Sequence, residues 1–190
     1  MNTINGNVLQ RNISKVFPSK LTSTIAEVVF LFLMGAIAML LHSKLRIPMH
    51  LPGKSGLFFM VIIITARASS KFTFGSSLAC LGAASVLLIS NLGFDDPFMP
   101  VVYIVLGIVL DILFGLTTAI KPNVIFIALA SGVSWMFIPL IRSVVSAITG
   151  FPYESLLTGL GFPLISHFIF GLIGGFIGAG LVYWAGKTQK

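Results

Sequence analysis

The chain has 190 residues, of which 56% are hydrophobic and only 9% are charged, and its mean hydropathy is +1.04. This composition excludes an ordinary soluble domain and predicts an integral membrane protein. A helix needs about 20 largely apolar residues to cross roughly 30 Å of hydrocarbon, so the length allows about five to seven crossings and no sizeable soluble domain.

The net charge of +7 would suggest a nucleic-acid partner in a soluble protein. Here the cations lie mainly beside apolar segments, where they set the topology, and no nucleic-acid partner is expected. Cys80 is the only cysteine, which excludes an intrachain disulfide and a cysteine-based metal site. We expect no metal and no cofactor.

The pattern predicts an all-α bundle of about six transmembrane helices with short loops. The six apolar segments are 23–43, 56–68, 74–92, 98–120, 123–149 and 160–186. Residues 1–22 are expected as a cytoplasmic tail or surface helix, residues 23–186 as one transmembrane domain and residues 187–190 as a cytoplasmic tail. Because 56–68 is short for a full crossing, five helices with a re-entrant piece remain an alternative.

The distribution of cations supports six crossings with both termini inside. That arrangement places eight cations on the cytoplasmic side: Arg11, Lys15, Lys20, Arg67, Lys71, Lys121, Lys187 and Lys190. Three cations, Lys44, Arg46 and Lys54, lie in the first external loop. We therefore expect a multi-pass protein of the cell membrane whose first external loop is unusually basic.

This loop contains two partial motifs for chemistry, in the stretch IPMHLPGKSGLFF. A phosphate-binding loop is excluded because Pro48 stands where its first glycine is required and no strand precedes it. The tetrapeptide Gly53 to Gly56 resembles the G-x-S-G of rhomboid intramembrane proteases, which implies Ser55 as nucleophile and His167 as base. The chain departs from that family because Ser55 opens the second helix and not the fourth.

Charged residues within membrane spans are costly, so they are usually paired or face a polar cavity. Asp111, Arg142 and His167 fall on the last three predicted helices, toward the outer half. With the first loop they predict an externally open pocket for a small anionic substrate. The predicted substrate-binding residues are Arg46, His50, Lys54, Ser55, Asp111, Trp135, Arg142 and His167. Two alternatives stay open, namely that Asp111 and Arg142 form a structural ion pair and that the loop is an ordinary interfacial turn.

The last helix carries two overlapping G-x-x-x-G patterns, at Gly171/Gly175 and Gly174/Gly178. Such patterns let helices approach closely, and packing within the protein's own bundle is favoured over a partner contact. Glu27 and Arg67 belong to the cytoplasmic side, where they either pair, meet a partner or extend to the interface.

Taken together, the chain resembles the substrate-binding S component of an energy-coupling factor (ECF) vitamin transporter. The resemblance rests on the size, the six helices, the long first loop HSKLRIPMHLPGKSG, the stretch TARASSKFTFGSSLACLGAASVLL and the glycine-rich last helix. It implies capture of a vitamin-like molecule under the first loop. It also implies association with a transmembrane coupling subunit and ATPase subunits, with no hydrolysis by this chain.

The first helix departs from the family because it lacks an A-x-x-x-A face for the coupling subunit. Gly35 and Ala38 form a smaller patch, and together with Arg67 they are the predicted docking residues. The competing hypotheses are an intramembrane serine protease or lipid-handling enzyme, and a non-catalytic structural protein of the envelope.

Overall fold

The computed structural model describes residues 8–17, 19–45, 51–89, 92, 96–119, 123–157 and 159–188. These residues form seven α-helices and one short 3-10 turn, and no β-strand is found among them. The elements are α1 (Val8–Val16), α2 (Lys20–Lys44), α3 (Gly56–Ser69), α4 (Gly75–Leu87), α5 (Met99–Ala119), α6 (Val124–Thr149), η1 (Glu154–Leu156) and α7 (Gly161–Thr188). The prediction of an all-helical protein is confirmed, and α1 lies within the segment expected as a tail.

Four helices, α2, α5, α6 and α7, are long and apolar enough to cross a membrane. The other two apolar helices, α3 and α4, are shorter, with 14 and 13 residues. At about 1.5 Å per residue each measures roughly 20 Å, less than the hydrocarbon thickness. The architecture is that of a helical membrane protein in which two short helices pack among longer ones.

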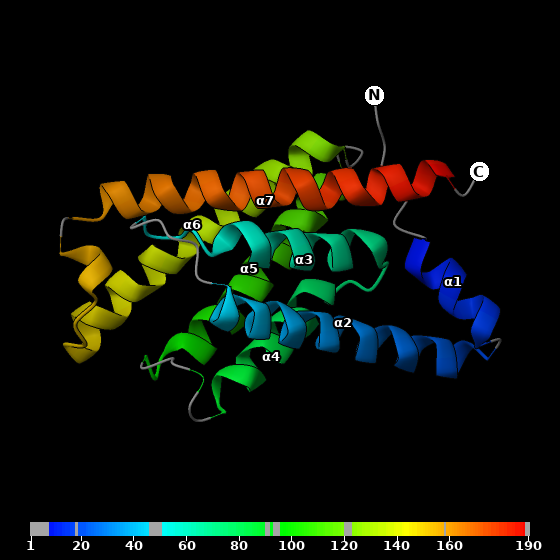
Figure 1. Ribbon diagram of the computed structural model, residues 1–190, viewed down its shortest axis with the longest axis horizontal. Coiled ribbons are helices and arrows are strands. Elements are labelled where there is room, and N and C mark those ends of the chain that lie inside the picture. Colours follow the sequence, from blue (N-terminus) through cyan, green and yellow to red (C-terminus); the bar gives the residue numbers. More distant parts are fainter. Residues whose placement is uncertain are drawn as a thin grey trace.

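The six larger helices pack in a closed ring, in the order α2, α4, α5, α6, α7, α3 and back to α2 (Figure 1). α3 also contacts α4 and α6, which places it toward the interior. Its sequence, GLFFMVIIITARAS, is apolar on every side, as expected for a helix enclosed by protein. The short α3 therefore obtains its burial from its neighbours.

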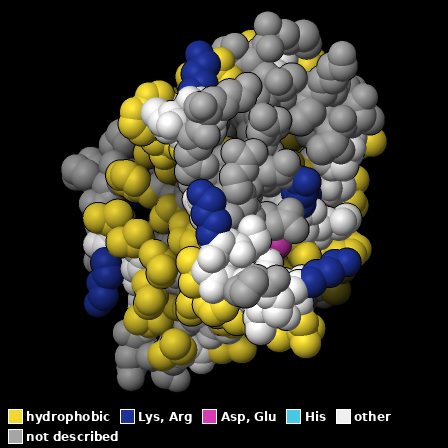
Figure 2. Space-filling view, turned by 90° about the vertical axis from the view of Figure 1, so that its right-hand side faces the viewer, with side chains coloured by type: hydrophobic (Ala, Val, Ile, Leu, Met, Phe, Trp, Pro, Cys, Tyr) yellow, Lys and Arg dark blue, Asp and Glu magenta, His cyan; other side chains and the backbone are white. Residues whose placement is uncertain are grey.

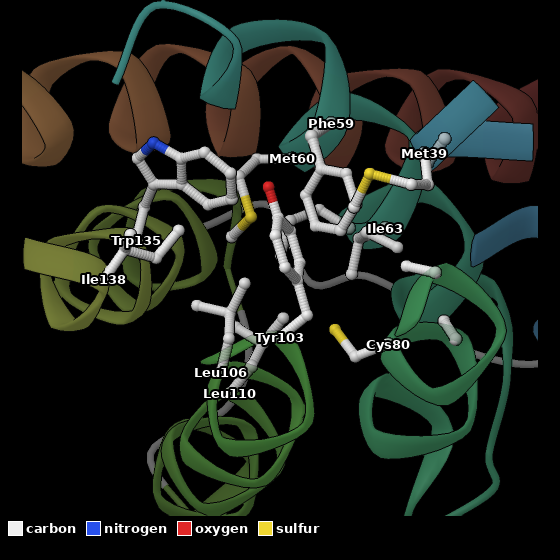
Figure 3. Packing of buried hydrophobic residues seen from close by; sticks show 14 of the residues in the cluster. Met39, Phe59, Met60, Ile63, Cys80, Tyr103, Leu106, Leu110, Trp135 and Ile138 are labelled. Atoms are coloured by element: carbon white, nitrogen blue, oxygen red, sulfur yellow. The ribbon is translucent and has the colours of Figure 1, made fainter. Parts of the chain in front are cut away.

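The core lies between α3 and the long helices (Figure 3). Phe59 and Ile63 of α3, Tyr103 of α5 and Trp135 of α6 are all almost fully buried there. Large aromatic side chains bury more area than any other residue type, so this cluster is a major source of stability.

Glycines determine how closely α7 packs against the neighbouring helices. A Cβ added at Gly174 would lie 2.6 Å from the Leu57 carbonyl oxygen of α3, and one at Gly178 would lie 2.7 Å from the Val61 carbonyl oxygen. The other glycine pair, Gly171 and Gly175, faces α6. Both G-x-x-x-G patterns are thus used inside the bundle, which confirms the favoured interpretation.

α2 and α4 also approach through small residues. A Cβ added at Gly35 would overlap the backbone of Ala79, and one added at Gly82 would overlap the backbone of Phe32. Ala38 is buried at 1% exposure. The small patch predicted to dock a coupling subunit is therefore occupied by α4 and is not available on the surface.

Candidate functional site

Buried polar side chains gather at two opposite ends of the helix bundle. We call the end that carries residues 51–55, between α2 and α3, the loop end. The end that carries α1, the turn between α3 and α4, and the C-terminus of α7 is called the terminal end. Each end contains an arginine paired with an aspartate, and the two pairs differ in their surroundings.

At the loop end, the first loop is fastened to α6 and α7. Trp135 Nε1 donates a hydrogen bond to the Gly53 carbonyl at 3.1 Å, and Ser166 Oγ donates to the Pro52 carbonyl. Gly53 has a φ of +78°, and a Cβ there would lie 2.7 Å from His167 Cγ. Both its conformation and its closeness to His167 require glycine.

Trp135 and His167, two of the predicted binding residues, lie together beneath this loop. Their rings stack with centroids 6.2 Å apart. His167 Nδ1 lies 2.7 Å from the Pro163 carbonyl, which can only accept, so this nitrogen carries the proton. Within the described part of the chain Ser55 forms no hydrogen bond with His167, and the geometry required for a serine–histidine dyad is not formed here.

An aromatic chain extends from Trp135 toward α2. Phe59 lies 5.4 Å from Trp135 and 4.9 Å from Tyr103, measured between ring centroids. Tyr103 Oη in turn lies 3.4 Å from Nδ1 of His42. Figure 3 shows the rings of Trp135, Phe59 and Tyr103 side by side. With His42 of α2, which lies beside Tyr103, four helices contribute rings to this group.

Arg142 of α6 places a half-buried positive charge at the loop end. Its guanidinium lies 3.6 Å from the Asp96 carboxylate and 5.2 Å from the centre of the Tyr153 ring. It is also within electrostatic range of His42 and His167. Arg142 Nε is buried and has no hydrogen-bond partner among the described residues. Asp96 Oδ2 is likewise buried and forms no hydrogen bond with them. The pair is therefore loose, since charge-assisted bonds normally measure about 2.7–2.9 Å.

Tyr153 completes the surroundings of this pair from the loop before η1. Its hydroxyl donates to the Asp96 carboxylate at 3.2 Å. Burial and the neighbouring carboxylate raise the pKa of Tyr153 to about 12. The hydroxyl therefore stays protonated and serves as a donor at physiological pH.

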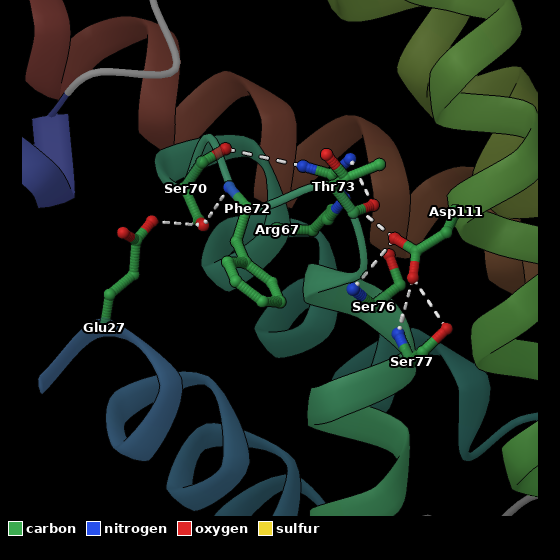
Figure 4. Close-up of polar contacts among 8 residues, drawn as sticks. All are labelled: Glu27, Arg67, Ser70, Phe72, Thr73, Ser76, Ser77 and Asp111. Atoms are coloured by element: carbon green, nitrogen blue, oxygen red, sulfur yellow. Dashed lines mark hydrogen bonds and ion pairs between the residues drawn. The ribbon is translucent and has the colours of Figure 1, made fainter. Parts of the chain in front are cut away.

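The terminal end holds the Asp111 carboxylate, which accepts four hydrogen bonds (Figure 4). Arg67 Nε donates at 3.0 Å, the backbone N–H groups of Ser76 and Ser77 donate at 2.9 and 2.8 Å, and Ser77 Oγ donates at 2.7 Å. The two N–H groups belong to the first turn of α4, so Asp111 caps that helix from α5. The pairing of Asp111 with Arg142 considered from the sequence was wrong.

Arg67 and Glu27 hold the turn between α3 and α4 from two sides. The two terminal nitrogens of Arg67 donate to the Ser70 and Thr73 carbonyls, at 3.4 and 3.3 Å. Ser70 Oγ donates to Glu27 of α2 and accepts from the backbone N–H of Phe72 (Figure 4). Glu27 therefore pairs with Ser70, and the buried Arg67 is a structural residue with only 8% of its surface exposed.

The structure thus divides the predicted binding residues between the two ends. Trp135, Arg142 and His167 lie at the loop end, and Asp111 lies at the terminal end. The half-buried Lys54 and Ser55 lie immediately before α3. Arg46 and His50 fall outside the described residues.

Several residues of the loop end were not found from the sequence, namely His42, Asp96, Tyr103, Tyr153 and Ser166. Tyr103 and His42 carried a usable signal, because polar aromatic residues within long apolar segments are rare enough to examine individually. Asp96 and Tyr153 carried none, since acids and tyrosines are ordinary in loops.

The described residues contain no group of three or more histidine, cysteine or acidic side chains suited to a metal ion. The loop end combines a half-buried cation, aromatic rings and a loop fastened over them. These are elements that bind a small organic anion. Comparison with known protein families, with curated proteins and with solved structures found no match to this chain.

Proposed function

We propose that the protein is the substrate-capture subunit of an ECF-type importer of the cell membrane. It binds a small, anionic, vitamin-like molecule at the loop end, which faces outward, and the first loop is the lid. One observation carries this proposal. The Pro52–Gly53 segment is fastened to α6 and α7 through Trp135 and Ser166, beside the aromatic cluster and Arg142.

The charge of the site favours an anionic ligand. Arg142 has a buried N–H without a partner among the described residues, and the carboxylate of Asp96 lies 3.6 Å from its guanidinium. A ligand carboxylate or phosphate that approaches more closely replaces Asp96 as the main partner and gains a charge-assisted bond. Trp135, Phe59 and Tyr103 are almost fully buried beneath the loop, and in this proposal they contact the apolar part of the small molecule once the lid opens.

The proposed topology has six crossings with both termini in the cytoplasm. In this orientation the terminal end faces the coupling subunit and the ATPase subunits, and the captured molecule leaves the site when they act. The chain itself hydrolyses nothing. Docking uses a surface other than Gly35 and Ala38, because α4 already covers these residues.

The experiment that tests this function is identification of a retained ligand. The protein is purified in a mild detergent, and mass spectrometry identifies any small molecule released on denaturation. We expect an organic anion from the wild type. The Arg142→Ala variant should retain at least about tenfold less of this anion than the wild type, since hydrogen bonds to a charged group contribute about 1.5–3 kcal/mol. Lys44→Ala, which removes an exposed cation at the same end, is the matched control.

Two results would contradict the proposal. Equal retention by Arg142→Ala and the control would place the site elsewhere. Absence of both a ligand and a co-purifying coupling subunit would remove the transport function altogether. Ser55→Ala tests the enzyme hypothesis separately, since a protease would lose its activity and a capture subunit would not.

A further inference from the structure

Lysine lies beside an exposed, large apolar side chain on three separate elements of the terminal end. On α1 and the start of α2, Lys15 and Lys20 flank Val16 and Phe17, which are 70% and 44% exposed. The same combination recurs at Lys71 and Phe74 in the turn between α3 and α4, where Phe74 is 63% exposed.

The C-terminal part of α7 repeats the combination. Trp184 is 68% exposed, and the Lys187 ammonium lies 4.9 Å from the centre of the Tyr183 ring. Tryptophan and tyrosine prefer the boundary between hydrocarbon and headgroups, and a lysine next to them extends toward water. This group marks the level at which the terminal end meets the membrane surface.

The exposed charges among the described residues of the terminal end are all positive. Its two described acids, Glu27 and Asp111, are 5% and 9% exposed, and each accepts hydrogen bonds inside the protein. The exposed charges among the described residues here are therefore the lysines. Figure 2, which looks onto this end, shows Lys and Arg side chains spread among apolar surface with little acidic surface between them.

From these observations we propose that the terminal end binds the headgroups of anionic phospholipids, with α1 lying in the plane of the membrane surface. α1 packs on α2 and also contacts α3 and α7, so its position is fixed by the bundle. In its second half, Ile13 and Val16 lie on a different side of the helix from Lys15. An amphipathic basic helix of this kind places its apolar face at the acyl boundary and its cations at the headgroups.

The proposal does not depend on the function assigned to the loop end. The exposed apolar side chains provide contact with any bilayer, and the lysines provide the preference for an anionic one. A preference that comes from charge also weakens with added salt, because these lysines are exposed.

The two tryptophans of the chain allow a direct test. Trp135 is 1% exposed, so quenching by a brominated lipid reports on Trp184. The full-length protein is reconstituted in phosphatidylcholine bilayers containing either brominated phosphatidylglycerol or brominated phosphatidylcholine at equal content. We expect stronger quenching by brominated phosphatidylglycerol, and a preference that falls as sodium chloride is raised.

The variant that tests the cations is Lys15→Gln/Lys20→Gln/Lys71→Gln/Lys187→Gln. Its preference for phosphatidylglycerol should fall by about fivefold or more, the change expected from removing even one lysine near an anionic surface. Lys44→Gln, at the loop end, is the matched control and should keep the preference. Trp184→Phe should abolish lipid quenching and so confirm the reporter.

Equal quenching of the wild type by the two lipids would overturn the proposal. An unchanged preference in the fourfold variant would do the same. If that variant does not fold, the salt series on the wild type still decides, since a preference that is insensitive to salt is not electrostatic and contradicts a role for the lysines.

Discussion

Among the described residues, two arginine–aspartate pairs have the same chemistry and different surroundings, since Arg67 and Asp111 are buried and Arg142 and Asp96 are half-buried. Arg67 and Asp111 meet at 3.0 Å, the Asp111 carboxylate accepts three more hydrogen bonds from Ser76 and Ser77, and each nitrogen of the Arg67 guanidinium donates one hydrogen bond. Arg142 and Asp96 are 3.6 Å apart, and each keeps a buried polar atom without a partner. The first pair is complete as it stands, and the second has unused hydrogen-bonding capacity.

This difference separates a structural role from a binding role. When every nitrogen and oxygen of a buried pair already has a partner within the protein, disturbing the pair leaves a charge uncompensated. A loose pair can exchange one partner for a ligand group without exposing a new charge. The comparison therefore assigns a structural role to the pair at the terminal end, and it agrees with the ligand site that we propose at the loop end.

The largest expected effect is that of Asp111→Ala. It leaves the Arg67 charge buried and alone and removes the cap of α4, so we expect the free energy of unfolding to fall by about 3–5 kcal/mol. The measurement is unfolding in mixed micelles, followed by circular dichroism.

Asp96→Ala is the matched variant at the loop end. It removes weaker contacts to Arg142 and Tyr153, and should lower the free energy of unfolding by about 1–2 kcal/mol. Similar losses for the two variants would erase the distinction between a saturated and a loose pair.

An intermediate effect is expected from Ser70→Ala. This change removes the donor to Glu27 and the acceptor for the Phe72 N–H. Leaving buried polar groups unsatisfied should cost about 1–3 kcal/mol. The adjacent Ser69→Ala is the control, because Ser69 Oγ bonds the Thr65 carbonyl within its own helix. If the two variants unfold at the same denaturant concentration, Glu27 does not support the turn between α3 and α4.

The smallest expected effect belongs to Tyr153→Phe, which removes one hydrogen bond to Asp96 and should cost about 0.5–1.5 kcal/mol. The folded-state pKa of Tyr153 is raised from 10.0 to about 12. Its contribution is therefore fully present below pH 10 and is lost as the pH rises toward 12. Stability curves of wild type and variant should run parallel up to pH 10 and converge above it. Curves that converge at neutral pH would contradict the assigned bond.

The class of protein and the positions of its helices followed from the residues alone. Each of the six predicted apolar segments contains one helix, because helix length and hydropathy are local properties. The use of Gly171, Gly174, Gly175 and Gly178 in helix packing was predictable for the same reason. Of the three ionisable residues expected together in the outer half, Arg142 and His167 lie at the loop end, and Asp111 lies at the terminal end.

Only the tertiary structure decided which charged groups meet. α3 and α4 are short, so the turn between them lies at the depth of Asp111, where Arg67 and the first turn of α4 reach its carboxylate. The sequence placed Asp111 on a helix but could not state which helix face it occupies or which neighbour it meets. The order in which the helices pack determines both. It therefore also determines that Asp111 pairs closely with Arg67, whereas Arg142 lies farther from its partner Asp96.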